Sequence, residues 1–375
     1  MFLFTKSKSI TMQLLNMAAA IVFVMSLSQV DLVYAGEPAF LPSPVRSVST
    51  VPTNGDVNPY GVAFVPKTFP SGGTIGAGDI LVSNFNNSQN LQGTGTTIIR
   101  VPSTGQPTLF FQGQPGLGLT TALVVLKAGL VLVGNLPTSD GTSATAQPGS
   151  IMVLDKSGNL LQTLTDSTLI NGPWDATVDD QGHFARLFIS NVLSGTVSRL
   201  DLKVSNQGVS IIEGTQIASG YQHRGDPVTL EVGPTGLVYE KKSDTLFVAS
   251  TGDNMVFSLH RAGTTRKDLG MGKVIYSDNV HLHGALAMVE APNGHLLVSN
   301  SDGVNPDQNQ PSEIVEFTKQ GEFVMQLSID PAQGGSFGLS VATSGETAKF
   351  AAVDDNTSTL NVWTLVFDND SGRFH

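Results

Sequence analysis

The chain has 375 residues and a formal net charge of −11, with 40% hydrophobic but only 14% charged residues. An acidic protein repels polyanions, so nucleic acid is not expected as a partner. The 40 Gly and 19 Pro residues indicate a loop-rich globular β protein rather than a disordered or helical one. Because the chain has no cysteine, a disulfide framework, a thiol nucleophile and a lipid-anchored cysteine are all excluded.

The first 35 residues have the pattern of a secretory signal peptide. Two early lysines precede an apolar run at 17–27 that is too short to cross a bilayer, and residues 33–35 end in the small residue of a cleavage site. The alternative, an uncleaved anchor, is opposed by the polar residues that follow and interrupt this run. We expect a mature start near Gly36, a periplasmic or secreted location, and no membrane span after cleavage.

A hairpin recurs six times in the rest of the chain. Its clearest copy, residues 284–300, joins two apolar strands through Asn293 and Gly294, and Asn-Gly between such strands is a strong hairpin signal. The ends of successive second strands lie 51, 56, 60, 49 and 55 residues apart. The other five strand pairs are expected at 59–64 and 80–84, 119–126 and 130–135, 173–178 and 187–191, 234–239 and 246–251, and 337–341 and 350–355.

A period near fifty residues with four strands per unit is typical of a β-propeller, whose blades are four-stranded sheets around a channel. Third strands are expected at 97–101, 150–154, 196–200, 255–259, 313–317 and 360–365. The sixth unit has no fourth strand of its own, while residues 45–51 have no other partner. The sequence therefore predicts an all-β fold, a single six-bladed β-propeller over residues 36–375, with its ring closed by this N-terminal strand.

Residues 246–257 resemble an NHL repeat, with a strand ending in a polar residue, a turn containing Gly252 and Asn254, and a third strand. As an architecture, the chain resembles the NHL-repeat and SMP-30 (gluconolactonase)-like six-bladed propellers. The SMP-30 resemblance implies a divalent metal in the channel, held by an acidic residue and Asn side chains, but no residue set here matches those ligands one by one. Asparagines stand where the NHL pattern usually has Asp, at Asn84, Asn135, Asn191 and Asn300.

These asparagines end four of the second strands. Their amides are expected to bond the backbone of neighbouring loops, and metal ligation is the alternative. Antiparallel pairing brings these strand ends and the starts of the first strands to one mouth of the channel. Long loops at 86–95, 136–148 and 301–311 would rim this loop-rimmed mouth.

Four ring-bearing residues are expected at equivalent positions near this mouth when the six hairpins are aligned: Tyr60, Trp174, His283 and Phe337. One interpretation is a stacking surface that binds a flat or sugar-like ligand, because aromatic faces bind such groups with little loss of entropy. The other is a hydrophobic plug that closes the channel.

A cluster of imidazole and carboxylate groups is a second candidate site. His281 and His283 would point to one side of a strand, and His223 and Asp226 lie in the preceding loop. Such a cluster suits Zn²⁺ binding or general-base catalysis, with His281, His283 and Asp226 as candidate metal ligands and all four as candidate catalytic residues. The alternative is a set of exposed loop histidines.

Residues 302–309 space oxygen-bearing side chains as Ca²⁺ loops do, without the EF-hand order, so Ca²⁺ binding and a plain polar loop both stay open. Gly-x-Ser-x-Gly, His-Glu-x-x-His and phosphate-loop motifs do not occur. Two functions are therefore expected: an exported propeller that binds a small molecule or a protein through the loop-rimmed mouth, or a metal-dependent hydrolase or lyase at that mouth. The sequence does not decide whether the protein is an enzyme.

Overall fold

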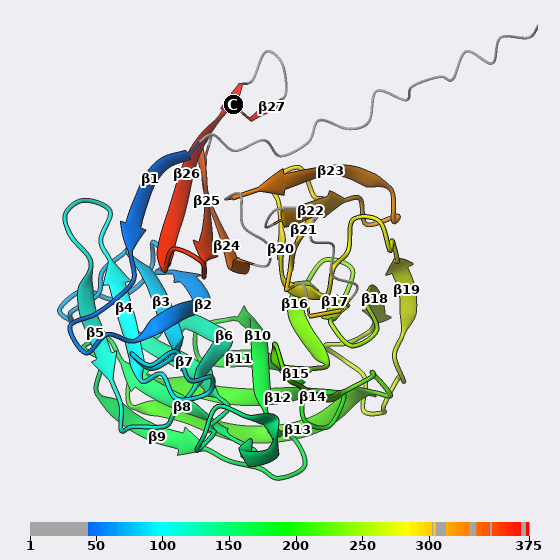
Figure 1. Ribbon diagram of the computed structural model, residues 1–375, viewed down its shortest axis with the longest axis horizontal. Coiled ribbons are helices and arrows are strands. Elements are labelled where there is room, and N and C mark those ends of the chain that lie inside the picture. Colours follow the sequence, from blue (N-terminus) through cyan, green and yellow to red (C-terminus); the bar gives the residue numbers. More distant parts are fainter. Residues whose placement is uncertain are drawn as a thin grey trace, which may run out of the picture. The chain divides into compact units, whose positions relative to one another are not determined.

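The computed structural model describes residues 44–301, 303–304, 313–329, 335–345, 347–368 and 373–374 (Figure 1). The described part forms six four-stranded antiparallel blades, which confirms the predicted six-bladed propeller. The expected signal peptide and most of the candidate calcium loop lie outside the described residues. No helix within the described ranges is long and apolar enough to span a membrane.

Each blade is built in chain order, from the central strand outward. Blade 1 contains β2 (Val57–Phe64), β3 (Ile80–Asn86), β4 (Thr97–Val101) and β5 (Thr108–Gln112). Blade 2 contains β6 (Leu119–Leu126), β7 (Leu130–Asn135), β8 (Ser150–Asp155) and β9 (Leu160–Leu164), and blade 3 contains β10 (Pro173–Asp180), β11 (Phe184–Asn191), β12 (Thr196–Ser205) and β13 (Gly208–Ser219).

The remaining blades follow the same order. Blade 4 contains β16 (Pro234–Glu240), β17 (Thr245–Ser250), β18 (Met255–His260) and β19 (Lys273–Tyr276). Blade 5 contains β20 (Ala285–Glu290), β21 (Leu296–Asn300), β22 (Glu313–Phe317) and β23 (Phe323–Ser328). Blade 6 contains β24 (Ser336–Ser344), β25 (Thr347–Asp354), β26 (Thr359–Asp368) and, as its outer strand, β1 (Pro44–Ser49).

The ring is closed by β1, which pairs antiparallel with β26 and places Val48 opposite Leu360. This confirms the predicted closing strand, although β1 begins and ends slightly earlier than residues 45–51. Arg46 also attaches β1 to blade 1, because its guanidinium donates to the carbonyl oxygens of Pro102 at 2.6 Å and Gly105 at 2.5 Å. Figure 1 shows β1 beside β26 at the junction of the first and last blades.

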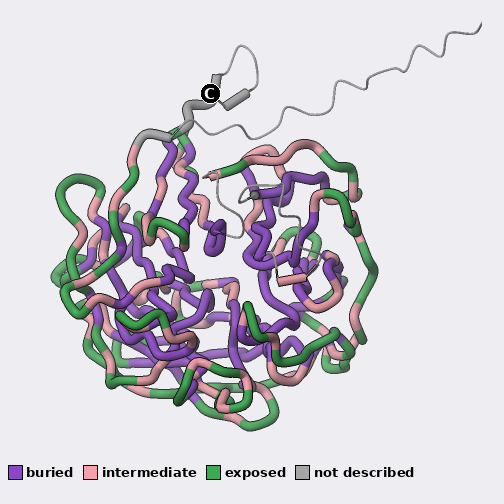
Figure 2. The backbone as a smooth tube through the Cα atoms, viewed as in Figure 1, coloured by how far each residue is buried: buried purple, intermediate pink, exposed green. Residues whose placement is uncertain are grey.

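Each of the six inner strands contacts the next, so that β2, β6, β10, β16, β20 and β24 surround the axis of the propeller. Buried residues dominate these strands and the middle of each blade, and exposed residues collect along the periphery (Figure 2). The described part of the chain also contains short strands that were not predicted. A short hairpin of β14 (Arg224–Asp226) and β15 (Leu230–Val232) lies in the chain between blades 3 and 4. The short strand β27 (Arg373–Phe374) pairs with β26.

Every inner strand has a bulge near its start, where its register against the second strand shifts. A bulge leaves a backbone N–H without a partner in the ladder, and a buried N–H needs an acceptor. Serines one residue before the strand-ending asparagines supply it in three blades. The hydroxyl of Ser83 accepts from Gly61 N at 2.9 Å, that of Ser190 from Asp175 N at 3.0 Å, and that of Ser299 from Ala287 N at 3.1 Å.

Three of the four strand-ending asparagines, Asn84, Asn191 and Asn300, bond loop backbone as expected, whereas Asn135 donates to the Ser150 hydroxyl. Asn191 donates from Nδ2 to Leu169 O at 3.2 Å and accepts at Oδ1 from Asn171 N at 3.0 Å. Asn84 similarly donates to Thr50 O at 3.1 Å. These amides hold the connections between blades against the ends of the second strands.

Candidate functional site

The ring-bearing residues near the loop-rimmed mouth pack against one another. Tyr60, Trp174 and Phe337 are only 3%, 1% and 8% exposed. The Tyr60 ring centroid lies 4.8 Å from that of Phe337, 5.6 Å from that of Trp174 and 4.8 Å from that of Phe85. We call Tyr60, Trp174 and Phe337, together with Leu286, the plug. These side chains belong to one buried cluster and fill the space between them, so ligand binding by the rings stays a prediction.

The strand register contradicts the predicted equivalence of His283 with Tyr60, Trp174 and Phe337. Ala285 pairs with Asn300 in blade 5 as Pro59 pairs with Asn84 in blade 1, so Leu286 is the residue equivalent to Tyr60. His283 precedes β20 and is 2% exposed, and its backbone N–H donates to Asn300 Oδ1 at 2.9 Å. The bulges cause this difference, because hairpin alignment from sequence does not reveal where the extra residue falls.

Loops cover the plug from the side of the loop-rimmed mouth. Leu136, after β7, and Leu230, in the β14–β15 hairpin, belong to the same buried cluster as the plug. Gln92 Nε2 donates to Val228 O at 2.8 Å, which joins the long loop of blade 1 to this hairpin. The described loops after β3 and β7 therefore lie against the plug or its covering hairpin, and most of the third loop, 301–311, lies outside the described residues.

The predicted histidine pair does not share one environment. His281 Nδ1 contacts the Asp278 carboxylate, and its ring stacks on Phe323 with centroids 3.9 Å apart. His283 is buried, as described above. The two side chains thus differ in burial: His281 is partly exposed beside Asp278 and Phe323, and His283 is buried.

The other two members of the predicted cluster are engaged within their own loop. His223 Nδ1 lies 3.1 Å from Tyr221 O, and Asp226 Oδ1 accepts from the backbone N–H groups of Val228 and Thr229. The described residues include no group of three or more His, Cys, Asp or Glu side chains that could hold a metal ion. The catalytic and metal-binding roles of His281, His283, His223 and Asp226 stay predictions.

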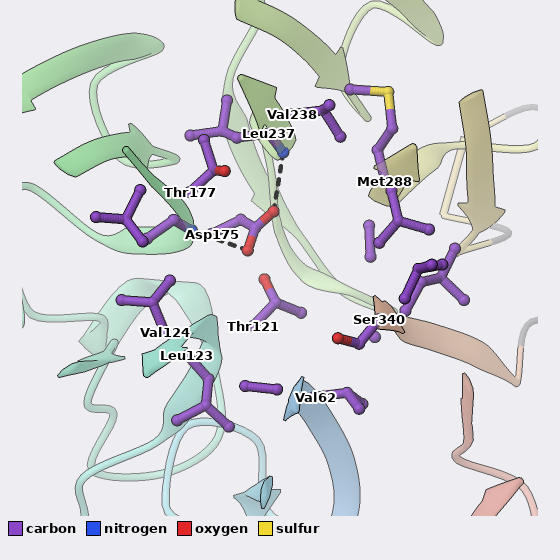
Figure 3. A pocket seen from close by; sticks show the side chains of 18 of the residues that line it. Val62, Thr121, Leu123, Val124, Asp175, Thr177, Leu237, Val238, Met288 and Ser340 are labelled. Carbon is purple, nitrogen blue, oxygen red and sulfur yellow. Dashed lines mark hydrogen bonds between the residues drawn. The ribbon is translucent and has the colours of Figure 1, made fainter. Parts of the chain in front are cut away.

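A cavity of about 420 Å³ lies among the inner strands (Figure 3). All six inner strands line it, from the bulge or just beyond it toward their carboxyl ends, and no ring of the plug lines it. We call the face at these carboxyl ends, where the chain turns into the second strands, the turn face. Each inner strand is the free edge of its blade, so unpaired backbone N–H and C=O groups face the cavity beside the side chains.

One position in the cavity wall breaks the pattern of the blades. The second residue of each bulge, or the corresponding residue of the longer bulge in blade 2, is small in five blades and Asp in the sixth: Gly61, Thr121, Asp175, Gly236, Ala287 and Gly338. Close backbone explains the glycines. A Cβ on Gly338 would lie 1.7 Å from Tyr60 O, and one on Gly236 would lie 2.4 Å from Leu286 O.

Asp175 reaches across to the next blade. Its Oδ2 accepts from Leu237 N of β16 at 2.9 Å, and its Oδ1 accepts from Ala176 N at 2.8 Å. The residue is only 9% exposed. Burial raises the pKa of the Asp175 carboxyl to about 7, although the two backbone hydrogen bonds act in the opposite direction. Sequence reasoning missed this residue, whose only signal was an acidic side chain directly after Trp174.

The other acidic groups near the cavity have cationic partners. Glu290, at the rim, accepts from Lys319 Nζ at 2.8 Å, and Asp179, further along β10, accepts from Lys241 Nζ at 2.8 Å. Burial acts to raise the pKa of Asp179, but its hydrogen bonds with Lys241 and Gln181 and the nearby positive charges hold that pKa below its usual value. Among the described lining residues, Asp175 is the carboxylate without a cationic partner.

The fold and this cavity define a six-bladed propeller with one plugged end and one site among its inner strands. The chain matches no protein-family model and no curated protein sequence. It resembles a putative oxidoreductase (glucose dehydrogenase) of Thermus thermophilus, with a TM-score of 0.51 and 11% identity over 85% of this chain and 99% of that one. It also resembles regucalcin, a calcium-binding protein of Agrobacterium tumefaciens, with a TM-score of 0.51 and 11% identity over 85% and 93% of the two chains.

At these identities the likeness shows the fold alone. The six-bladed part of the predicted resemblance is confirmed, and the structural neighbours include a regucalcin, as the SMP-30 resemblance predicted. The cavity has one buried carboxylate, and the described residues include no group of three acidic or imidazole ligands, so the divalent metal implied by that resemblance stays a prediction.

Proposed function

We propose that this protein is an exported propeller that binds a small molecule in the cavity among its inner strands. The cavity carries the proposal. Its volume of about 420 Å³ lies within the range of roughly 300–1,000 Å³ that is usual for small-molecule sites, and its wall combines apolar side chains with one buried carboxylate. The signal-peptide pattern of the first 35 residues supports export.

The ligand enters from the turn face. The plug and its covering loops fill the loop-rimmed mouth, so a ligand placed there would have to displace Tyr60, Trp174 and Phe337 from one another. At the turn face the cavity wall continues toward the carboxyl ends of the inner strands, where it includes Tyr239, Glu290 and Val341. The proposal therefore puts the site at the opposite end of the channel from the sequence-based expectation.

A cavity-filling substitution tests this proposal. Ser340, on β24, lines the cavity, whereas Thr163 is exposed on the outer strand β9. Ligand-observed NMR with benzyl alcohol and benzylammonium as probes should detect binding of at least one probe to the wild type and to Thr163→Phe, but not to Ser340→Phe. Circular dichroism would verify that all three proteins are folded. Binding of neither probe, or equal binding to both variants, would reject the proposal.

A lactonase-like hydrolase is the second candidate. The observation that favours it is a carboxyl group in a cavity with a pKa near neutral pH, as general bases have. Hydrolysis of gluconolactone by the wild type, with loss in Asp175→Asn, would support this activity. The assay should be repeated with added Ca²⁺ and after chelation, since the chemistry of the structural neighbours does not transfer at 11% identity.

A further inference from the structure

We infer that the cavity selects an organic cation, a molecule with one ammonium group on an apolar body. The inference rests on the proposed function and names the class of ligand. It starts from Asp175, the one charged position among the six equivalent bulge residues. A desolvated carboxylate without a counter-charge is costly, and a ligand that brings a positive charge into contact with it removes most of that cost.

The hydrogen-bonding groups around Asp175 also suit a donor. Each carboxylate oxygen accepts one backbone N–H, from Leu237 or Ala176, and an oxygen of this kind has room for a second donor. The free edges of the inner strands add carbonyl oxygens along the cavity wall. An ammonium group, which has only donors, would meet acceptors in several directions.

The walls suit the apolar part of such a ligand. Leu123, Leu237, Val238 and Met288 line the cavity around Asp175 (Figure 3), and Leu339 also belongs to its wall. The flexible Met288 side chain adapts to ligands of different shape. No Lys, Arg or His is among the described lining residues, so a phosphate or a sugar acid would find no cationic side chain in the wall.

The charges at the rim of the cavity also favour a cation over an anion. Lys319 lies between two carboxylates, Glu240 and Glu290, which leaves this group of three side chains with a net negative charge. Asp179 and Lys241 form a neutral pair nearby. A negative rim attracts cations to the cavity and discourages anions.

Protonation of Asp175 should control the selectivity. Besides Asp175, the inner strands carry six titratable side chains: Tyr60, Asp179, Asp180, Tyr239, Glu240 and Glu290. Asp179 pairs with Lys241, Glu240 and Glu290 share Lys319, and Tyr239 donates to Asp244. Asp180 accepts from Lys127 N, and Tyr60 lies in the plug. Asp175 is therefore the group whose ionisation changes the charge of the cavity near neutral pH. Cation binding should strengthen as pH rises through about 7.

Isothermal titration calorimetry with two probes of the same shape tests the inference. Benzylammonium stays charged at roughly pH 8 and pH 5, and benzyl alcohol is neutral at both. At the higher pH the wild type should bind benzylammonium about tenfold or more tightly than benzyl alcohol, because the contact with Asp175 is charge-assisted. At the lower pH, and in Asp175→Asn, this preference should disappear.

Glu231→Gln is the matched control, because Glu231 is a buried acid on β15 that does not line the cavity. It should keep the preference of the wild type. Equal affinity of the two probes at the higher pH would overturn the inference and leave the proposed small-molecule site standing, whereas binding of neither probe would overturn both. The pH comparison uses the wild-type protein, so it tests the preference for benzylammonium even if Asp175→Asn folds poorly.

Discussion

Asp175 makes folding depend on pH in a direction opposite to that of most carboxyl groups. Burial raises the pKa of this carboxyl from 3.8 to about 7 in the folded protein, so the folded state binds the proton more tightly than the unfolded chain. Its contribution to stability is greatest below the unfolded pKa and is lost as pH rises toward about 7. Burial, aided by Asp226, also raises the pKa of Glu231 to about 7.

Replacement of Asp175 by Asn should reduce this pH dependence. The amide keeps nearly the same shape and cannot ionise, so the fall in the free energy of unfolding between about pH 4 and pH 8 should shrink by roughly 3–4 kcal/mol. Urea unfolding at a series of pH values measures the difference. An unchanged pH profile would mean that the carboxyl is solvated in the folded protein.

Substitution of the single residue Trp174 tests whether the plug is packed as described. Its ring is buried against Tyr60 and Phe85, and its Nε1 has no hydrogen-bond partner. Trp174→Ala should lower the free energy of unfolding by about 3–5 kcal/mol, the usual cost of emptying an aromatic core position.

Trp174→Phe is the matched variant, since it keeps a ring and loses no hydrogen bond. Its cost in the same urea experiment should be less than half that of Trp174→Ala. Equal, small effects of the two substitutions would show that the ring is not packed as the structure has it.

At the scale of the element, the second strand β11 also holds a loop in place through the asparagine at its end. Asn191, at the end of β11, donates from Nδ2 to Leu169 O and Ser198 Oγ and accepts at Oδ1 from Asn171 N. Asn191→Ala should lower the free energy of unfolding by about 2–4 kcal/mol, since several buried groups lose their partner.

The exposed Asn159, which bonds Asp155 in the β8–β9 turn, provides the comparison. Asn159→Ala should change stability by no more than about 0.5 kcal/mol. Thermal and urea unfolding of both variants measure these effects, and similar values for the two would contradict a special role for the strand-ending asparagines.

The hairpins and third strands were predictable because runs of apolar residues and turn residues such as Asn293 and Gly294 are local signals, and because the hairpin repeats with a period near fifty. The cavity was not. A bulge reverses the side-chain alternation beyond it, so the sequence did not show that Asp175 faces the axis or that Leu286 takes the place expected for His283. The plug and the stacking surface use the same aromatic residues, and only the packing of Tyr60 against Trp174 and Phe337 distinguishes them.

At the scale of the whole molecule, the closing strand should decide stability. A protein that lacks residues 36–49 loses β1 and exposes the edge of β26, whereas a protein that lacks only residues 36–43 keeps β1. We expect the longer deletion to lower the melting temperature by more than about 10 °C, and the shorter one to change it little. Equal melting temperatures, measured by circular dichroism, would contradict closure by β1.

The same closure sets an order of events for a chain made from its N-terminus. Thr50 Oγ1 donates to Ser358 O, 308 positions further along the sequence. Joining such distant segments requires a long loop to close, which is slow compared with the formation of a hairpin. During synthesis, β1 is made before the other described strands and must wait for β26. The strand that is made first, β1, therefore completes the blade that forms last, and the ring stays open until β26 has been synthesised.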